Sequence, residues 1–149
     1  MATPTARLFG TVAPKDYLGF WDGERFEPQA VARFLGLTKA EVGKVAGVAP
    51  SSVRFDQKIP HDVRERLLEI ANICGLVAQF FAGDRARTAL WFRTRNPMLG
   101  NIAPRDMIRF GRYERLSRFV LEALQENSAG PGLSGAEEFS RGATARAAT

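Results

Sequence analysis

The chain contains few of the residues on which enzyme chemistry most often depends. It has one histidine, His61, and one cysteine, Cys74, so it can form neither an intrachain disulfide nor a zinc site built from His and Cys ligands. Cys74 falls within the apolar stripe of a predicted helix, which favours a buried structural thiol, and His61 follows Pro60 at a helix start, which favours a surface or capping role. We therefore predict no metal, no cofactor and no catalytic site, and expect the chain not to be an enzyme.

Phosphate-binding loops and membrane segments are also missing. The sequence has no G-x-x-x-x-G-K-[ST] loop and no G-x-G-x-x-G after a predicted strand. No apolar run approaches the roughly 20 residues that span a bilayer, and residues 1–10 lack the apolar stretch of a signal peptide. We expect a soluble, cytoplasmic protein with no membrane partner.

Acidic residues are outnumbered by basic ones. The 149 residues include 21 Lys and Arg against 16 Asp and Glu, a formal net charge of +5. A basic balance favours an acidic partner, of which nucleic acid is the commonest. A solvated basic surface without a partner is the alternative explanation.

The spacing of apolar residues predicts an all-helical fold of about six helices. Residues 1–27 form an N-terminal extension in which Asp22-Gly23 suggests a short hairpin, and its aromatics are expected to pad the outside of the following helices. Capping boxes at residues 38–41 and 62–65 predict helix starts. The helix that opens at the second box, roughly residues 62–82, is apolar around much of its circumference, so it should be central to the core.

The last segment, residues 127–149, has a different composition. Sixteen of its 23 residues are Ala, Gly, Ser, Thr or Pro, which predicts a disordered tail. We therefore divide the chain into the extension 1–27, two helical segments, 28–60 and 61–126, and the tail.

The first helical segment has the spacing of a helix-turn-helix between residues 35 and 54. Valines line the inner face of its first helix, and Gly47 permits the left-handed residue of a tight turn. A third helix should follow from about Ala49 to Arg54. It should be short, because residues 56–60 resist its continuation.

This stretch resembles the Xre-type helix-turn-helix family, and the resemblance implies contact with a DNA major groove. Base edges would be contacted by one group of side chains, and phosphates by a second group at the start of the preceding helix. Two lysines are placed to add charge toward the DNA backbone. The base-facing group is Ser51, Ser52 and Arg54; the phosphate group is Thr38 and Lys39; the added lysines are Lys44 and Lys58.

A second pattern, W-(x)4-N-P-x-L-G-(x)3-P, runs from Trp91 to Pro104. Asn96-Pro97 stops the preceding helix, Gly100 allows a turn, and Pro104 begins the next helix. Large apolar residues and turn glycines usually serve the fold, so Trp91, Leu99, Gly100 and Pro104 are expected to be structural.

Together with the final helices, this pattern resembles the toxin-binding domain of MbcA/ParS/Xre antitoxins, from about residue 63 to 125. The resemblance implies a cognate RES-domain toxin, which consumes NAD or uses it for ADP-ribosylation, and an antitoxin that blocks the toxin's NAD pocket. It also implies a homodimer, a toxin–antitoxin hetero-oligomer, and repression of the protein's own operator DNA. Candidate toxin-binding residues are Arg93, Arg95, Asn96, Pro97, Met98 and the basic face Arg112, Arg115 and Arg118.

Two other functions remain open from the residues alone. One is a stand-alone Xre-like transcription regulator whose C-terminal half only dimerises. The other is a protein adaptor that never touches DNA. This sequence departs from many relatives in its long tail and in Asn101, which stands where a second glycine is commoner.

Overall fold

Six α-helices dominate the computed structural model, which describes residues 16–128. This confirms the predicted all-α fold and the suggested hairpin. Residues 1–15 of the extension and residues 129–149 of the tail lie outside the described part. The elements are β1 (Trp21–Asp22), β2 (Arg25–Phe26), α2 (Pro28–Leu35), α3 (Lys39–Ala46), η1 (Pro50–Ser52), α4 (His61–Phe80), α5 (Arg85–Arg93), η2 (Pro97–Leu99), α6 (Pro104–Arg109) and α7 (Tyr113–Ser128).

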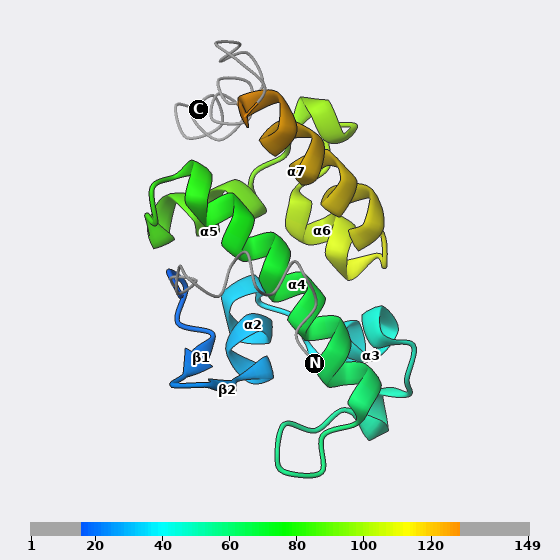
Figure 1. The fold of residues 1–149 in the computed structure, drawn as a ribbon. Coiled ribbons are helices and arrows are strands. Elements are labelled where there is room, and N and C mark those ends of the chain that lie inside the picture. Colours follow the sequence, from blue (N-terminus) through cyan, green and yellow to red (C-terminus); the bar gives the residue numbers. More distant parts are fainter. Residues whose placement is uncertain (1–15, 129–149) are drawn as a thin grey trace.

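The longest helix, α4, runs through the middle of the molecule, and α2, α3, α5 and α7 all pack against it (Figure 1). Its predicted apolar stripe is buried: Leu67, Ile70, Cys74 and Val77 are each 0–1% exposed. Burial raises the pKa of the Cys74 thiol well above its usual range, which leaves the thiol unreactive, as expected for a structural cysteine.

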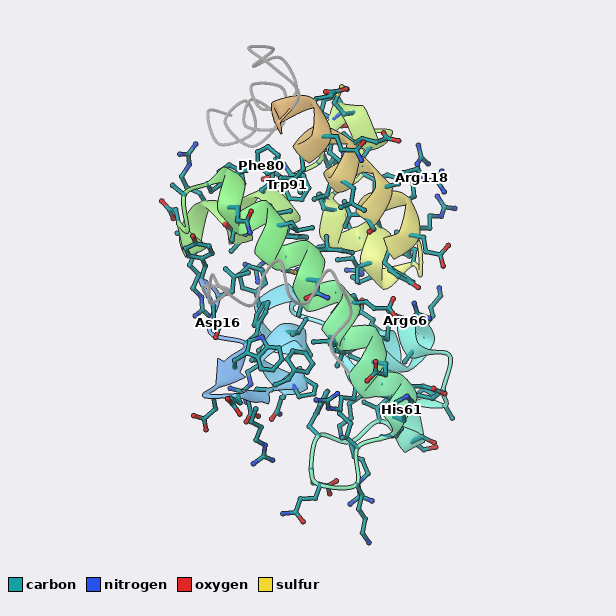
Figure 2. All side chains as sticks on the ribbon, viewed as in Figure 1. Asp16, His61, Arg66, Phe80, Trp91 and Arg118 are labelled. Carbon is teal, nitrogen blue, oxygen red and sulfur yellow. The ribbon has the colours of Figure 1, made fainter. Side chains whose placement is uncertain are left out.

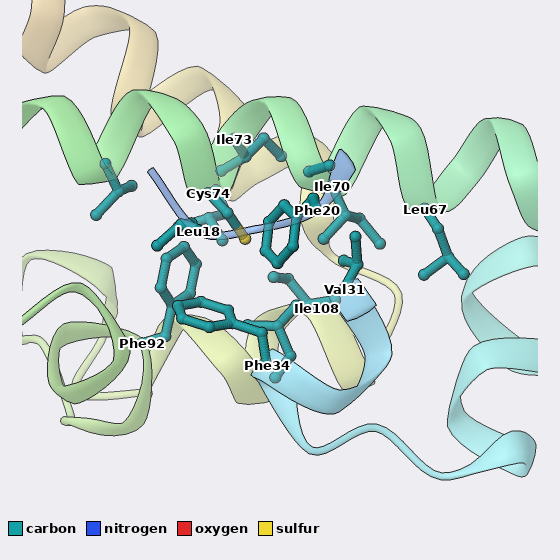
Figure 3. Close-up of a cluster of buried hydrophobic side chains, with 14 of the residues drawn as sticks. Leu18, Phe20, Val31, Phe34, Leu67, Ile70, Ile73, Cys74, Phe92 and Ile108 are labelled. Atoms are coloured by element: carbon teal, nitrogen blue, oxygen red, sulfur yellow. The ribbon is translucent and has the colours of Figure 1, made fainter. Parts of the chain in front are cut away.

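Both halves of the chain contribute to one hydrophobic core (Figure 3). Phe20 before the hairpin packs edge-on against Phe34 of α2 at 5.5 Å between ring centroids, and Phe34 packs edge-on against Phe92 of α5 at 6.1 Å. The expectation that the N-terminal aromatics only pad the outside was therefore wrong for Phe20 and Phe26, which are each 3% exposed. The two predicted helical segments share this core.

Of the two capping boxes predicted at helix starts, one is present and the other is not. Thr38 and Glu41 form the predicted capping box of α3, with both reciprocal hydrogen bonds present. The second predicted box is wrong, because α4 begins at His61 and its N-cap is Pro60. Asp62 is therefore the second helical residue, where its carboxylate cannot act as the N-cap acceptor.

The predicted short third helix of the helix-turn-helix is present at its expected start but is shorter than expected. It is η1, a three-residue 3-10 helix, after which the backbone extends at Val53 with ψ 117°. The side chain of Asp56 accepts hydrogen bonds from Arg54 and from the Lys58 backbone N–H. Such local side-chain bonds offer the backbone an alternative to the helix, which explains why it ends at Ser52.

A glycine inside α3 sets how closely the turn approaches that helix. A Cβ added at Gly43 would lie 2.8 Å from the Val48 carbonyl oxygen and 3.3 Å from the Pro50 nitrogen. Glycine within a helix costs about 1 kcal/mol relative to alanine, and here it permits contact between two backbones. Sequence reasoning missed this residue, although an interior helical glycine is itself a signal of close packing.

We expect Gly43→Ala to destabilise the protein by about 1–3 kcal/mol, because a backbone atom must move to admit the methyl group. Gly75→Ala is the matched control, since a Cβ at Gly75 in α4 would meet nothing within 4 Å. That control should stabilise the protein by about 0.5–1 kcal/mol. Urea unfolding of both variants measures the difference, and equal effects would show that α3 and η1 do not meet as closely as described.

Within residues 16–128, no single helix is long and apolar enough to cross a membrane. The pair α4 and α5 meets the length and composition criteria only when taken together, across a bend of 116°.

Candidate functional site

The residues singled out from the sequence fall on two separate parts of the molecule. The α3–η1 segment lies near the start of α4, and the segment between α5 and α6 lies at the opposite end of the molecule (Figure 1). We call this second segment, residues 94–103, the Asn96 turn.

Asn96 organises the turn that bears its name. Its side-chain oxygen accepts the Met98 backbone N–H at 2.9 Å, and its carbonyl accepts the N–H groups of Leu99 and Asn101 at 3.0 and 2.9 Å. Its own N–H donates to the Ile102 carbonyl at 3.2 Å. Four bonds thus hold one short loop in one shape.

Asn96 is only 2% exposed, so its predicted role as a direct toxin contact does not fit this conformation. The buried side chain satisfies the backbone of the turn, and we reassign Asn96 as a structural residue. The proline that follows it fixes φ for the first position of η2.

The residues predicted to be structural lie inside or at turns. Trp91, Leu99 and Pro104 are buried, and Trp91 meets Phe92 edge-on at 5.0 Å. Gly100 and Asn101 both adopt left-handed backbone angles, with φ of 75° and 61°. Asparagine tolerates this region better than most residues, so the left-handed backbone at position 101 does not require a glycine.

The Asn96 turn exposes the side chains of Arg95, Pro97, Met98 and Asn101, and Arg93 at the end of α5 is exposed as well. Met98 is the most exposed of the large hydrophobic residues in the described chain, at 54%. Arg93 donates from its guanidinium to the Phe34 carbonyl at 3.2 Å, which ties this region to α2. The result is an exposed methionine on a hydrogen-bonded turn that also exposes Arg95, and we call this feature the Met98 tip.

The basic face of α7 is separate from the Met98 tip in sequence but also solvent-exposed. Arg112, which directly precedes α7, and Arg115 and Arg118 within the helix are all exposed. Figure 2 shows Arg118 directed away from the body of the molecule while Trp91 lies within it. The opposite face of α7 is held in the core by Leu116 and Val120, both fully buried.

All side chains predicted to contact DNA are exposed around α3 and η1. None of them is buried, although the Thr38 hydroxyl also caps α3. They are Thr38, Lys39, Lys44, Ser51, Ser52, Arg54 and Lys58.

Arg54 is held by a carboxylate that sequence reasoning treated only as a helix breaker. Its Nε donates to Asp56 Oδ1 at 2.8 Å, and its Nη2 donates to Asp56 Oδ2. These bonds lower the pKa of the Asp56 carboxyl, chiefly through Arg54 and then through the Lys58 N–H, and they raise the pKa of Arg54.

The last residue of α6 and the residue that follows it connect the α3–η1 segment to the second half of the chain. Arg109 Nε lies 2.7 Å from Glu41 of α3, and Lys44 Nζ lies 5.9 Å from the ring of Phe110, which is half-exposed. Burial raises the pKa of Glu41, but hydrogen bonds from Thr38 and the charges of Arg109 and Arg105 outweigh it, so the pKa is lowered overall. Neither Arg109 nor Phe110 was singled out from the sequence, because their contacts with α3 depend on the tertiary fold.

No group of three or more His, Cys, Asp or Glu side chains in residues 16–128 is arranged to hold a metal ion.

Comparison with known proteins places the chain among the antitoxins of toxin–antitoxin systems. It belongs to the family of the mycobacterial cidal antitoxin MbcA. It is 33% identical over 96 residues to the MbcA proteins of Mycobacterium tuberculosis (strain H37Rv) and Mycobacterium bovis, a match that covers 62% of this chain and 82% of each relative. No protein-family model matches the chain, and no solved structure does.

Proposed function

We propose that this antitoxin neutralises a RES-domain toxin by binding over the toxin's NAD site. The observation that carries the proposal is the Met98 tip, a half-exposed methionine on a hydrogen-bonded turn at the end of the molecule far from α3. Interfaces are enriched in methionine and arginine, and their cores exclude water around a few anchoring side chains.

The rigidity of the Asn96 turn favours tight binding. A loop that is ordered before binding loses less conformational entropy when the partner docks. Arg95 and the basic face of α7 would add contacts at the rim, where charges mainly set the association rate and the choice of partner.

A second part of the proposal is repression of the protein's own operator DNA through α3 and η1. Its support is the exposure of all seven candidate side chains and the local charge, since residues 28–60 hold five basic and two acidic residues. With η1 so short, phosphate contacts would supply most of the affinity, and Ser51, Ser52 and Arg54 would supply the base contacts. A cytoplasmic homodimer would place two such elements on one operator.

Co-purification with the product of a neighbouring RES-domain gene tests the first part. We expect a stable toxin–antitoxin hetero-oligomer that survives size-exclusion chromatography. If the two proteins elute as free components, neutralisation by direct binding is excluded. A stand-alone regulator, whose C-terminal half only dimerises, would then explain the fold better.

DNA binding should show the salt dependence of a phosphate-dominated contact. The logarithm of the binding constant is expected to fall linearly with the logarithm of salt concentration, with a slope of about −0.9 per neutralised phosphate. Fluorescence anisotropy with a duplex from the protein's own promoter measures the slope, and Lys39→Ala should reduce its magnitude by about one. A slope unchanged by Lys39→Ala would remove that lysine from the phosphate contacts.

A further inference from the structure

We propose that Asp56 is a positioning residue that presents Arg54 to a guanine in the major groove. This inference rests on the proposed DNA-binding function and explains how bases could be recognised without an α-helix at this position. It starts from the chemistry of the two side chains and the hydrogen bonds between them.

The guanidinium of arginine has five N–H donors arranged along two usable edges. Asp56 occupies the side edge, because it accepts from Nε at 2.8 Å and also from Nη2. The end edge, formed by Nη1 and the second N–H of Nη2, is left pointing away from the carboxylate. That edge has two parallel donors, which match the N7 and O6 acceptors of guanine.

The carboxylate is itself held in place. Asp56 Oδ1 also accepts the backbone N–H of Lys58 at 2.9 Å. The loop backbone therefore holds the Asp56 carboxylate in place, and the carboxylate holds the Arg54 guanidinium. Both side chains remain half-exposed, at 50% and 52%, so the free edge of Arg54 is accessible to a ligand.

Stability alone does not account for this arrangement. Exposed ion pairs contribute little to folding, because water screens them and two long side chains must be ordered. Restricting the rotamers of Arg54 before binding has a different effect, since less side-chain entropy is then lost when DNA docks. A carboxylate near phosphates would also weaken non-specific binding. The pair should therefore raise the ratio of the affinity for the preferred sequence to the affinity for random duplex DNA.

Asp56→Asn separates this role from a structural one. The preferred sequence is first selected from a duplex pool with about 20 randomised base pairs, and each guanine is then replaced by 7-deazaguanine, which lacks the N7 acceptor. The wild-type protein is expected to lose about tenfold in affinity at the contacted guanine. Asp56→Asn should lose most of that discrimination and bind random duplex at least as tightly as wild type. Arg54→Ala should lose the discrimination completely.

Asp62→Asn is the matched control, because Asp62 is also an exposed carboxylate near the start of α4. It should keep the tenfold discrimination, and all three variants should unfold at the wild-type midpoint. If Asp56→Asn keeps full discrimination at the same guanine, the inference is overturned while the DNA-binding proposal stands. A wild-type protein that binds no duplex in the pool overturns the DNA-binding proposal itself, and the inference with it.

Discussion

Met98→Asp is expected to weaken toxin binding by about 30-fold to 1,000-fold, which corresponds to the roughly 2–4 kcal/mol lost at an interface hot spot. The reason is that a desolvated carboxylate would replace an apolar anchor at the centre of the contact. The fold should be unaffected, because the side chain of Met98 is 54% exposed and its backbone N–H is held by Asn96. Titration of the purified toxin with each variant, by calorimetry or by surface binding, measures the change.

The control for this variant is Phe110→Asp. It makes a comparable apolar-to-acidic change at a residue of similar exposure, 50%, but next to Lys44 of α3. We expect it to leave toxin binding within about threefold of wild type, as surface substitutions away from an interface do. If Phe110→Asp abolishes binding and Met98→Asp does not, the toxin docks on the α3–α6 side of the molecule and the Met98 tip is not the interface.

Trp91→Ala should have the largest effect on stability, a loss of about 3–5 kcal/mol. The side chain is 1% exposed and packs edge-on against Phe92, so truncation opens a cavity in the hydrophobic core beside α5. Because small domains are stable by only about 5–15 kcal/mol, the unfolding midpoint should fall by roughly 15 °C. Urea and thermal unfolding followed by circular dichroism measure both quantities.

The matched control is Trp21→Ala, which removes the other tryptophan of the chain. Trp21 is 41% exposed and contacts Phe26 from the surface, at 5.2 Å between ring centroids. Its removal should lower the free energy of unfolding by about 1 kcal/mol or less. Comparable losses for the two variants would mean that the W-(x)4-N-P pattern does not mark a core anchor.

Sequence reasoning succeeded where a feature depends on neighbouring residues along the chain. The periodicity of α4, the capping box of Thr38 and Glu41, and the all-helical class each follow from spacing within a few turns. The burial of Trp91 and Leu99 follows from size and hydrophobicity.

Prediction from the sequence failed where competing local bonds or tertiary contacts decide the position and partners of a side chain. The family resemblance made Asn96 a candidate toxin contact, yet three backbone N–H groups and one backbone carbonyl bond to this residue, and its side chain is buried. Asp56 was read as a helix breaker, but its partner Arg54 could be identified only from side-chain geometry. The contacts of Arg109 and Phe110 with α3 require the end of α6 to pack against residues Glu41 and Lys44, which lie far earlier in the chain.

NAD turnover by the toxin tests the central claim most directly. Purified RES-domain toxin is incubated with NAD, and remaining NAD is measured as the full-length antitoxin is added. We predict that NAD loss falls to background near one antitoxin per toxin, and that the Met98→Asp variant restores it at the same ratio. NAD loss that continues at full rate in the presence of excess wild-type antitoxin would contradict the proposed neutralisation.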